Sequence, residues 1–226
     1  MIISYASHQP VKVSNEQVTV IGTNSSVVYQ DLLRGFRDDG QIKVCSDTYD
    51  ELEVSKTIDL VGDVCTGGEE IDRRYLSRIT KAFLDDLTDP QRNKIHDSLN
   101  RLYNTVQEQL YMIDLPIEVT YDFDLKELTR FAKIHFDSGT ANNPCAMIES
   151  ILKVYEECHL KTTLIFTNVR QYLSTDQLRE IEAMIKEIRV SVVLIEFTEM
   201  EHRDFYGNAD FYYIDEDFVD WHNANH

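Results

Sequence analysis

The sequence contains few cations. Lys and Arg total 22 against 40 Asp and Glu, which gives a formal net charge of -18 at pH 7. Such a charge opposes nonspecific attraction to nucleic acid, because the phosphate backbone is itself negative. The objection concerns the average surface only, since salt screens each charge over about 8–10 Å and a few cations gathered on one face could still bind an anion. The distribution of the charges therefore decides whether nucleic acid is excluded.

The sequence also lacks metal-binding cysteine pairs and long apolar runs. Its four cysteines form no C-x-x-C pair, the usual pattern of a zinc or redox site, and we expect reduced thiols; they are Cys45, Cys65, Cys145 and Cys158. No apolar run approaches the roughly 18 residues of a membrane span. The segment Met1–Pro10 lacks the features of a signal peptide. We expect a soluble, cytoplasmic protein without a membrane partner.

Both ends of the chain contain strand patterns. Short apolar, β-branched runs predict strands at Ile2–Tyr5, Val11–Val13, Val18–Ile21, Gln41–Cys45, Ile58–Val61, Thr162–Thr167, Val190–Phe197 and Phe211–Ile214. Helices are predicted at Val27–Arg37, Cys145–Cys158 and Ser174–Ile188, and Ser174 with Gln177 fits a capping box. The near-continuous apolar strands around the last helix indicate a β-α-β unit in a parallel sheet covered on both faces.

The middle of the chain is helical. Helical spacing of apolar residues predicts one helix over Glu69–Leu87 and a longer one from Asp89-Pro90 to about Ile113, which together would form an antiparallel hairpin with a shared apolar stripe. A short helix is expected over Asp124–His135, and a loop over Ser138–Pro144. The prediction is an α/β head (1–66 and 139–226) with an inserted helical leg (67–138).

A phosphate-binding loop is the first functional site to test, because Val18–Ile21 ends in Gly22 and a helix follows. That motif needs a second glycine, a Lys for the outer phosphates and a Ser or Thr for magnesium. Here Gly22 is followed by Thr-Asn-Ser-Ser-Val-Val-Tyr, and Thr162–Thr167, taken as the neighbouring strand, ends at the uncharged Asn168. We expect no bound nucleotide and no nucleotide hydrolysis.

Several segments resemble one known family. They are LIFTNVRQYLSTDQLREIEAMIKEIRVSVVLIEFTE (Leu164–Glu199), YYIDEDF (Tyr212–Phe218), DLVGD (Asp59–Asp63) and VIGTNSSVV (Val20–Val28). In order and spacing the chain resembles the Csn-two family of type II-A CRISPR adaptation proteins. The resemblance implies a degenerate P-loop nucleoside-triphosphatase-like head with an inserted helical leg. It also implies a homotetrameric ring that encircles double-stranded DNA ends during spacer acquisition, beside the CRISPR adaptation integrase complex and the effector nuclease. The protein would not be an enzyme.

The resemblance gives two sets of residues a role. The densest cationic group, Arg73, Arg74, Arg78 and Lys81, falls on one side of a predicted helix and would contact DNA phosphates, which confers affinity without sequence preference. The alternative is a solvated helix face with i,i+4 ion pairs.

Calcium is the cofactor that the resemblance implies, and Glu118, Asp122 and Asp124 could supply its oxygen ligands. Their segment contains fewer carboxylates than the family's acidic turn. The alternative is that Asp124 with Glu127 caps a helix. The seven histidines show no ligand spacing.

Three functions therefore remain open: a noncatalytic DNA-encircling ring, a nucleotide-binding switch or hydrolase, and a protein-only scaffold of the same fold.

Overall fold

The computed structural model describes residues 1–37, 40–65, 68–117 and 124–223. The chain divides into two compact units. We call the first, Met1–Asp72 with Phe136–His226, the α/β unit, and the second, Arg73–His135, the helical unit. Among the described residues, none of the helices has both the length and the apolar character needed to cross a membrane.

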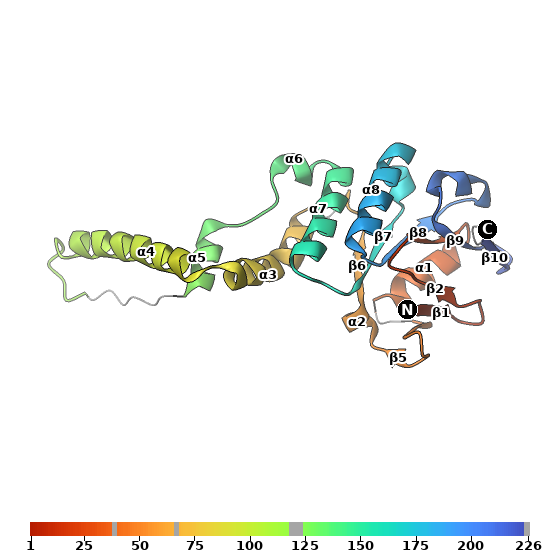
Figure 1. The fold of residues 1–226 in the computed structure, drawn as a ribbon, viewed down its shortest axis with the longest axis horizontal. Helices are drawn as coiled ribbons and strands as arrows, with labels where there is room; N and C mark the ends of the chain where they lie inside the picture. The colour runs from red at the N-terminus through yellow and green to blue at the C-terminus, as the bar shows by residue number, and fades with distance from the viewer. Residues whose placement is uncertain (38–39, 66–67, 118–123, 224–226) are drawn as a thin grey trace. The chain divides into compact units, whose positions relative to one another are not determined.

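A six-stranded sheet forms the centre of the α/β unit (Figure 1). Its order is β10 (Asp220–Asn223), β9 (Asp210–Ile214), β3 (Thr19–Thr23), β8 (Val192–Phe197), β7 (Thr163–Thr167) and β6 (Ile58–Gly62). All neighbours are parallel except the pair of β10 and β9. Every residue of β3 and β7 is buried, as expected for central strands covered on both faces. The predicted α/β fold with a mostly parallel sheet is confirmed.

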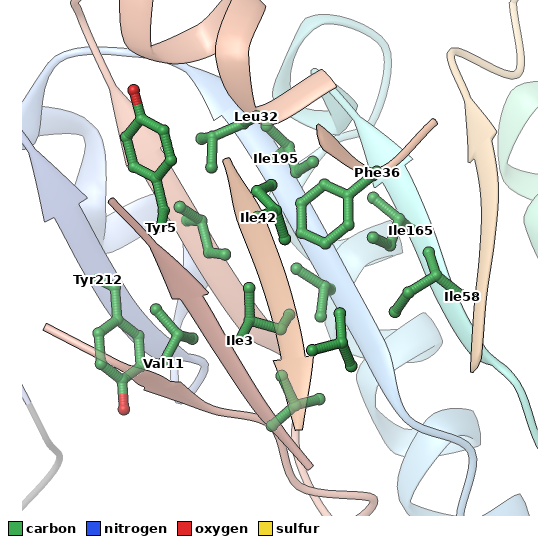
Figure 2. Packing of buried hydrophobic residues seen from close by; sticks show 14 of the residues in the cluster. Ile3, Tyr5, Val11, Leu32, Phe36, Ile42, Ile58, Ile165, Ile195 and Tyr212 are labelled. Carbon is green, nitrogen blue, oxygen red and sulfur yellow. The ribbon is translucent and has the colours of Figure 1, made fainter. Parts of the chain in front are cut away.

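One face of this sheet packs against helix α1 (Ser26–Gly35) and a small antiparallel sheet. The small sheet has the order β2 (Val11–Lys12), β1 (Ile2–Tyr5), β4 (Ile42–Cys45) and β5 (Glu51–Leu52). Figure 2 shows Leu32 and Phe36 beside Ile42, with Ile165 and Ile195 of the large sheet facing them in the same buried cluster. Burial of this apolar surface holds α1 and both sheets together.

The opposite face is covered by α7 (Pro144–Glu157), α8 (Thr175–Ile188) and two 3₁₀ segments, η1 (Val169–Gln171) and η2 (Met200–Tyr206) (Figure 1). Alternate strand residues point to this side, and Leu164, Phe166 and Leu194 are buried. The predicted capping box of α8 is present: Ser174 Oγ accepts a hydrogen bond from Gln177 N, and Gln177 Oε1 accepts one from Ser174 N. This second layer completes the three-layer arrangement of the unit.

Several short elements were not predicted. They are β5, α2 (Val54–Thr57), α6 (Ser138–Ala141) in the expected loop, η1, η2 and β10. Each is too short to show a hydrophobic period, and side-chain caps define some of them instead. In α6, for example, Asp137 Oδ1 accepts hydrogen bonds from the backbone of Gly139 and Thr140.

Polar side chains define strand β10 and the turn before it. Asp215 accepts hydrogen bonds from Val219 N at 2.8 Å and from Trp221 Nε1 at 2.9 Å and so shapes the turn between β9 and β10. His222 lies in β10 and forms a hydrogen bond with Asp210 Oδ1 at 2.9 Å. These polar contacts have no apolar periodicity, which is why the sequence pattern did not predict them.

In the helical unit, α3 (Gly68–Asp86) is followed by α4 (Asp89–Leu110), and α5 (Leu125–Ala132) comes after the segment 118–123. The N-cap of α4 is Thr88, not Asp89: Thr88 and Gln91 form the capping box, with Pro90 in the first turn. Arg92 also bonds to the carbonyl oxygens of Leu84 and Leu87 at the end of α3. The connection between α3 and α4 is therefore tied by hydrogen bonds.

The predicted packing of α3 against α4 is wrong. Within the helical unit the two helices run end to end (Figure 1). None of the 22 residues of α4 is buried. Five apolar residues of α4 form a stripe that spans an arc of about 80° around the helix axis. They are Ile95, Leu99, Leu102, Val106 and Leu110. Leu102 and Val106 are 56% and 46% exposed. Ile95, Leu99 and Leu110 are half-buried, so within the described part of the chain no residue of the stripe is fully covered.

Candidate functional site

The loop between β3 and α1 has the place of a phosphate-binding loop, but its donors are occupied. Thr23 Oγ1 accepts a hydrogen bond from Ser25 N at 3.0 Å, and Ser25, the N-cap of α1, accepts one from Val28 N at 3.5 Å. Backbone N–H groups at a helix start are the usual anion ligands. At two positions of this loop, side chains of the chain itself take that role.

Gly22 has a packing role in this loop. A Cβ added at Gly22 would lie 3.1 Å from Tyr213 Cδ2 and 3.2 Å from Phe211 Cζ, so aromatic rings of β9 fill the space beside it. Its backbone is part of β3, paired with β8 and β9. The glycine therefore allows aromatic side chains to pack closely against the strand.

Asn168, at the end of β7, connects three elements. Its backbone is left-handed, with φ of 54°. Its Nδ2 donates to the Tyr29 hydroxyl of α1 at 2.7 Å, and its Oδ1 accepts from Phe197 N at 2.9 Å. Asn tolerates this backbone conformation better than most residues. Asn168 thus fastens the ends of β7 and β8 to α1, where a nucleotide enzyme would keep an open site.

The strand beside β3 corrects the sequence interpretation. That strand is β8, not β7, and Glu196 of β8 is level with Gly22. The strand beside β3 therefore does contain a buried carboxylate near its end. Its Oε1 accepts from Val169 N at 2.8 Å and its Oε2 accepts from the Tyr206 hydroxyl at 3.0 Å. These partners belong to η1 and η2, so Glu196 points to the face opposite α1 and away from the position of a magnesium ligand.

The electrostatics of this edge disfavour a triphosphate. Burial raises the pKa of Glu196 to about 7, although hydrogen bonds from Val169 N and Tyr206 partly stabilise its ionised form. A second carboxylate, Glu199, accepts a hydrogen bond from Asn24 Nδ2 in the loop itself at 3.1 Å. Residues 24–33, which follow β3, contain no Lys or Arg, and Arg170 of η1 is a cation that interacts with Glu196. Phosphoryl transfer needs cations at this place.

The charge of the protein is distributed unevenly between its two units. Residues 73–135 contain ten Lys and Arg and ten Asp and Glu, whereas the rest of the chain contains twelve and thirty. The helical unit is therefore neutral, and the α/β unit carries the entire net charge of -18. Screening confines the field of the acids to about 8–10 Å. On average, the charge of the helical unit opposes a polyanion less than that of the α/β unit does.

Within the helical unit, cations gather in a groove between α3 and α5. The groove has a volume of about 660 Å³. Arg73 and Lys81 line it from α3, and Lys126 and Arg130 line it from α5. Asp85 is the one carboxylate among the described residues of this lining. The structure thus brings two of the predicted DNA-binding residues together with two cations that the sequence analysis missed.

The other two predicted cations lie elsewhere. Arg74 and Arg78 are half-buried and are not among the described residues that line the groove. Lys126 and Arg130 are four residues apart, the spacing of a shared helix face, and this pattern could have identified them. Arg130 also pairs with Glu127 at 2.6 Å, an exposed contact that contributes little to stability.

The predicted calcium ligands are described only in part. Glu118 and Asp122 lie outside the described residues. Asp124 is the N-cap of α5, and its Oδ1 accepts a hydrogen bond from Lys126 N at 2.8 Å. Among residues 1–37, 40–65, 68–117 and 124–223, no three His, Cys, Asp or Glu side chains are grouped as metal ligands. The capping role is therefore present, and calcium binding stays a prediction.

Glu196 should make the stability of the fold depend on pH. Its pKa is about 7 when folded against an ordinary value of 4.5, so the folded state retains a proton that the unfolded chain releases. Stability should fall as pH rises from about 4.5 to 7 and be constant above that. In Glu196→Gln, which cannot ionise, thermal or urea denaturation should show a gain over the parent that grows with pH, reaching on the order of 3 kcal/mol.

Tyr206→Phe is the matched variant. It removes the hydroxyl that stabilises the ionised carboxylate, so the decline in stability should extend to higher pH than in the parent. Parallel stability curves for the parent and Glu196→Gln across this pH range would contradict the assignment.

Comparisons with known proteins agree with this geometry. A family model described as "CRISPR-associated protein (Cas_Csn2)" matches residues 35–218. The crystal structure of Stu0660 of Streptococcus thermophilus is similar over 100% of this chain and 77% of that chain, with a TM-score of 0.55 and 11% identity, a likeness that shows the fold. No curated protein matches the chain. Because the family model spans most of the sequence, the resemblance is confirmed: the chain belongs to the CRISPR-associated Csn2 family.

Proposed function

We propose that this CRISPR-associated protein is a noncatalytic accessory protein of spacer acquisition that binds double-stranded DNA without sequence preference. The carrying observation is the charge distribution: the helical unit is neutral, while the α/β unit holds all the excess acid. The predicted contacts Arg73, Arg74, Arg78 and Lys81 all belong to the helical unit. Side-chain contacts with phosphates give affinity and orientation but do not distinguish bases.

We further propose that the protein assembles as a homotetrameric ring around linear DNA. The apolar stripe of α4 supports assembly, because a 22-residue amphipathic helix with no buried residue needs a covering surface. A second copy of this chain offers the same stripe, as a symmetric contact requires. The CRISPR adaptation integrase complex and the effector nuclease are the proposed partners outside the ring.

The mass in solution should depend on the α4 stripe. The parent protein should exceed the monomer mass of 26.3 kDa in light scattering. Leu102→Asp/Val106→Asp should lower the assembled mass, because two charges cannot be buried in an apolar contact. Both residues are exposed, so the monomer fold should survive. Asn93→Asp/Asn104→Asp adds the same charge to the opposite side of α4 and should leave the mass unchanged. Equal masses for both variants would exclude this stripe as the contact.

Two alternatives are a nucleotide-binding switch and a protein-only scaffold with the same fold and no DNA binding. The loop geometry argues against the first, because Thr23 and Ser25 occupy backbone donors that a phosphate would need. The net charge of -18 favours the second. Tight nucleotide binding in calorimetry, or no DNA binding at low salt, would favour one of these alternatives over the ring.

Calcium is proposed to stabilise the assembly. A protein with 40 acidic residues repels its own copies, and a cation that bridges carboxylates from Glu118, Asp122 and Asp124 would lessen that repulsion. Millimolar calcium should raise the thermal midpoint or the oligomer fraction, and magnesium should do less. Glu118→Gln/Asp122→Asn, which leaves the Asp124 cap intact, should abolish the calcium effect. No change in the parent on adding calcium would remove the proposed site.

Encirclement should make DNA binding depend on topology. The protein should bind a linear duplex and bind a closed circle of the same sequence much more weakly, since a ring must be threaded from an end. Gel shifts or filter binding with the two topologies measure this. An open basic surface would bind both equally, and that result would exclude the ring.

The salt dependence identifies the contacts. Phosphate contacts release counterions, so log affinity should fall linearly with log salt. Arg73→Ala/Arg74→Ala/Arg78→Ala/Lys81→Ala should make the slope shallower by up to about 3.6 if all four side chains contact phosphates. A control removes four exposed cations of the α/β unit, Lys43, Lys153, Lys161 and Lys186, and should preserve the slope. An unchanged slope in the first variant would exclude the predicted residues.

A further inference from the structure

We propose that the groove between α3 and α5 holds one or two nucleotides of a single-stranded overhang at the end of the bound duplex. This inference rests on the proposed function. In the proposed function, the protein contacts only the phosphate backbone of a duplex. The groove is a concave site, and its lining includes apolar side chains as well as cations. It lies entirely within the helical unit, since every lining residue falls between Arg73 and His135.

Charge indicates the class of ligand. Of the described residues that line the groove, four are cations and one is a carboxylate, in a protein whose acids outnumber its cations by nearly two to one. Two of the cations project from each of two helices, and the groove lies between them. Arg73 and Lys81 are eight residues apart, so their positions on α3 are separated by about 12 Å. A ligand that meets both walls and extends along α3 needs more than one negative group, as a short nucleotide strand has.

The apolar residues that line the groove indicate a ligand with an apolar part in addition to phosphate. Between the cations the lining includes the aliphatic side chains of Leu76 and Leu84, both half-buried, and the buried Thr129. The Thr129 hydroxyl donates to Lys126 O at 2.7 Å, so its polar group is already satisfied within α5. An apolar floor does not stabilise a bare phosphate. It does suit the face of a base, which packs on apolar side chains and on Arg guanidinium groups.

The size of the groove agrees with a single strand. Its volume of about 660 Å³ lies within the range of small-ligand sites, roughly 300–1,000 Å³. One or two unstacked nucleotides fit such a space, while a base-paired duplex would only cover its rim. Unstacking a base costs least where the strand has no partner, which is the case at an overhang. The groove is therefore matched to a frayed or recessed DNA end.

The α5 wall distinguishes this site from the duplex contacts. Lys126 and Arg130 are exposed, and Arg130 has an exposed partner in Glu127 that a phosphate could replace. Neither residue belongs to the α3 set proposed to bind duplex DNA. Removing both should weaken recognition of the overhang while the duplex contacts remain.

The experiment compares a blunt linear duplex with the same duplex carrying a three-nucleotide overhang, in both polarities, by fluorescence anisotropy with the full chain. The parent should bind the overhang duplex about 10-fold more tightly, as expected for stacking of one or two bases. Lys126→Ala/Arg130→Ala should lose this preference and keep its affinity for the blunt duplex within about two-fold. Lys94→Ala/Arg101→Ala, two exposed cations of α4 outside the groove, should keep the preference.

Two further measurements do not depend on the folding of a variant. An overhang with 5-iodouracil at its last position should, on irradiation, crosslink the parent protein to peptides from α3 or α5. A short single-stranded oligonucleotide should compete with the overhang duplex, whereas a deoxynucleoside monophosphate at the same concentration should not.

Any result other than those predicted above contradicts the inference. Equal binding of blunt and overhang duplexes, or crosslinks only to the α/β unit, would exclude the groove as an overhang site and leave the duplex proposal standing. A preference that persists in Lys126→Ala/Arg130→Ala places the site elsewhere. Equal competition by the monophosphate makes the ligand a free nucleotide. Binding to neither duplex removes both proposals together.

Discussion

Mutual repulsion of acidic groups is the constraint on which the surfaces of this protein depend. The α/β unit has thirty acidic residues and twelve cations, and the helical unit has ten of each. The average charge of the first unit opposes a polyanion, so the proposed DNA contacts are assigned to the second unit. The groove between α3 and α5 is the place where that unit collects its cations. Net charge alone would have excluded a function that the distribution of charge permits.

The edge of the large sheet has the strand–loop–helix layout of a nucleotide site, but its polar side chains bind one another. Thr23 and Ser25 occupy donors at the start of α1, Asn168 ties α1 to β7 and β8, and Glu196 is directed to η1 and η2. These side chains use one another as partners in place of phosphate and metal. These hydrogen bonds connect the strand ends to one another and occupy groups that a ligand would need. It therefore supports a structural role for this edge and a binding role for the helical unit.

Helix α4 and the α3–α5 groove differ in what they require from outside the chain. The stripe of α4 is apolar and exposed, so it is complete only when another apolar surface covers it. The groove is formed by residues of one chain and carries its own charge. The proposed assembly and the proposed recognition of DNA ends can therefore be tested separately by mutation, with Leu102 and Val106 changed for the first and Lys126 and Arg130 for the second.

The sequence alone determined the family, the mostly parallel sheet and the capping of α8, because these depend on local apolar runs and on residues three positions apart. It also located the cations of α3. Tertiary structure decided which strand lies beside β3, and thereby that Glu196, and not Asn168, is level with Gly22. It decided that α3 and α4 run end to end, and that Lys126 and Arg130 join Arg73 and Lys81 across more than forty residues of chain. Strand order and groove walls are contacts between distant residues, and no local period in a sequence encodes such contacts.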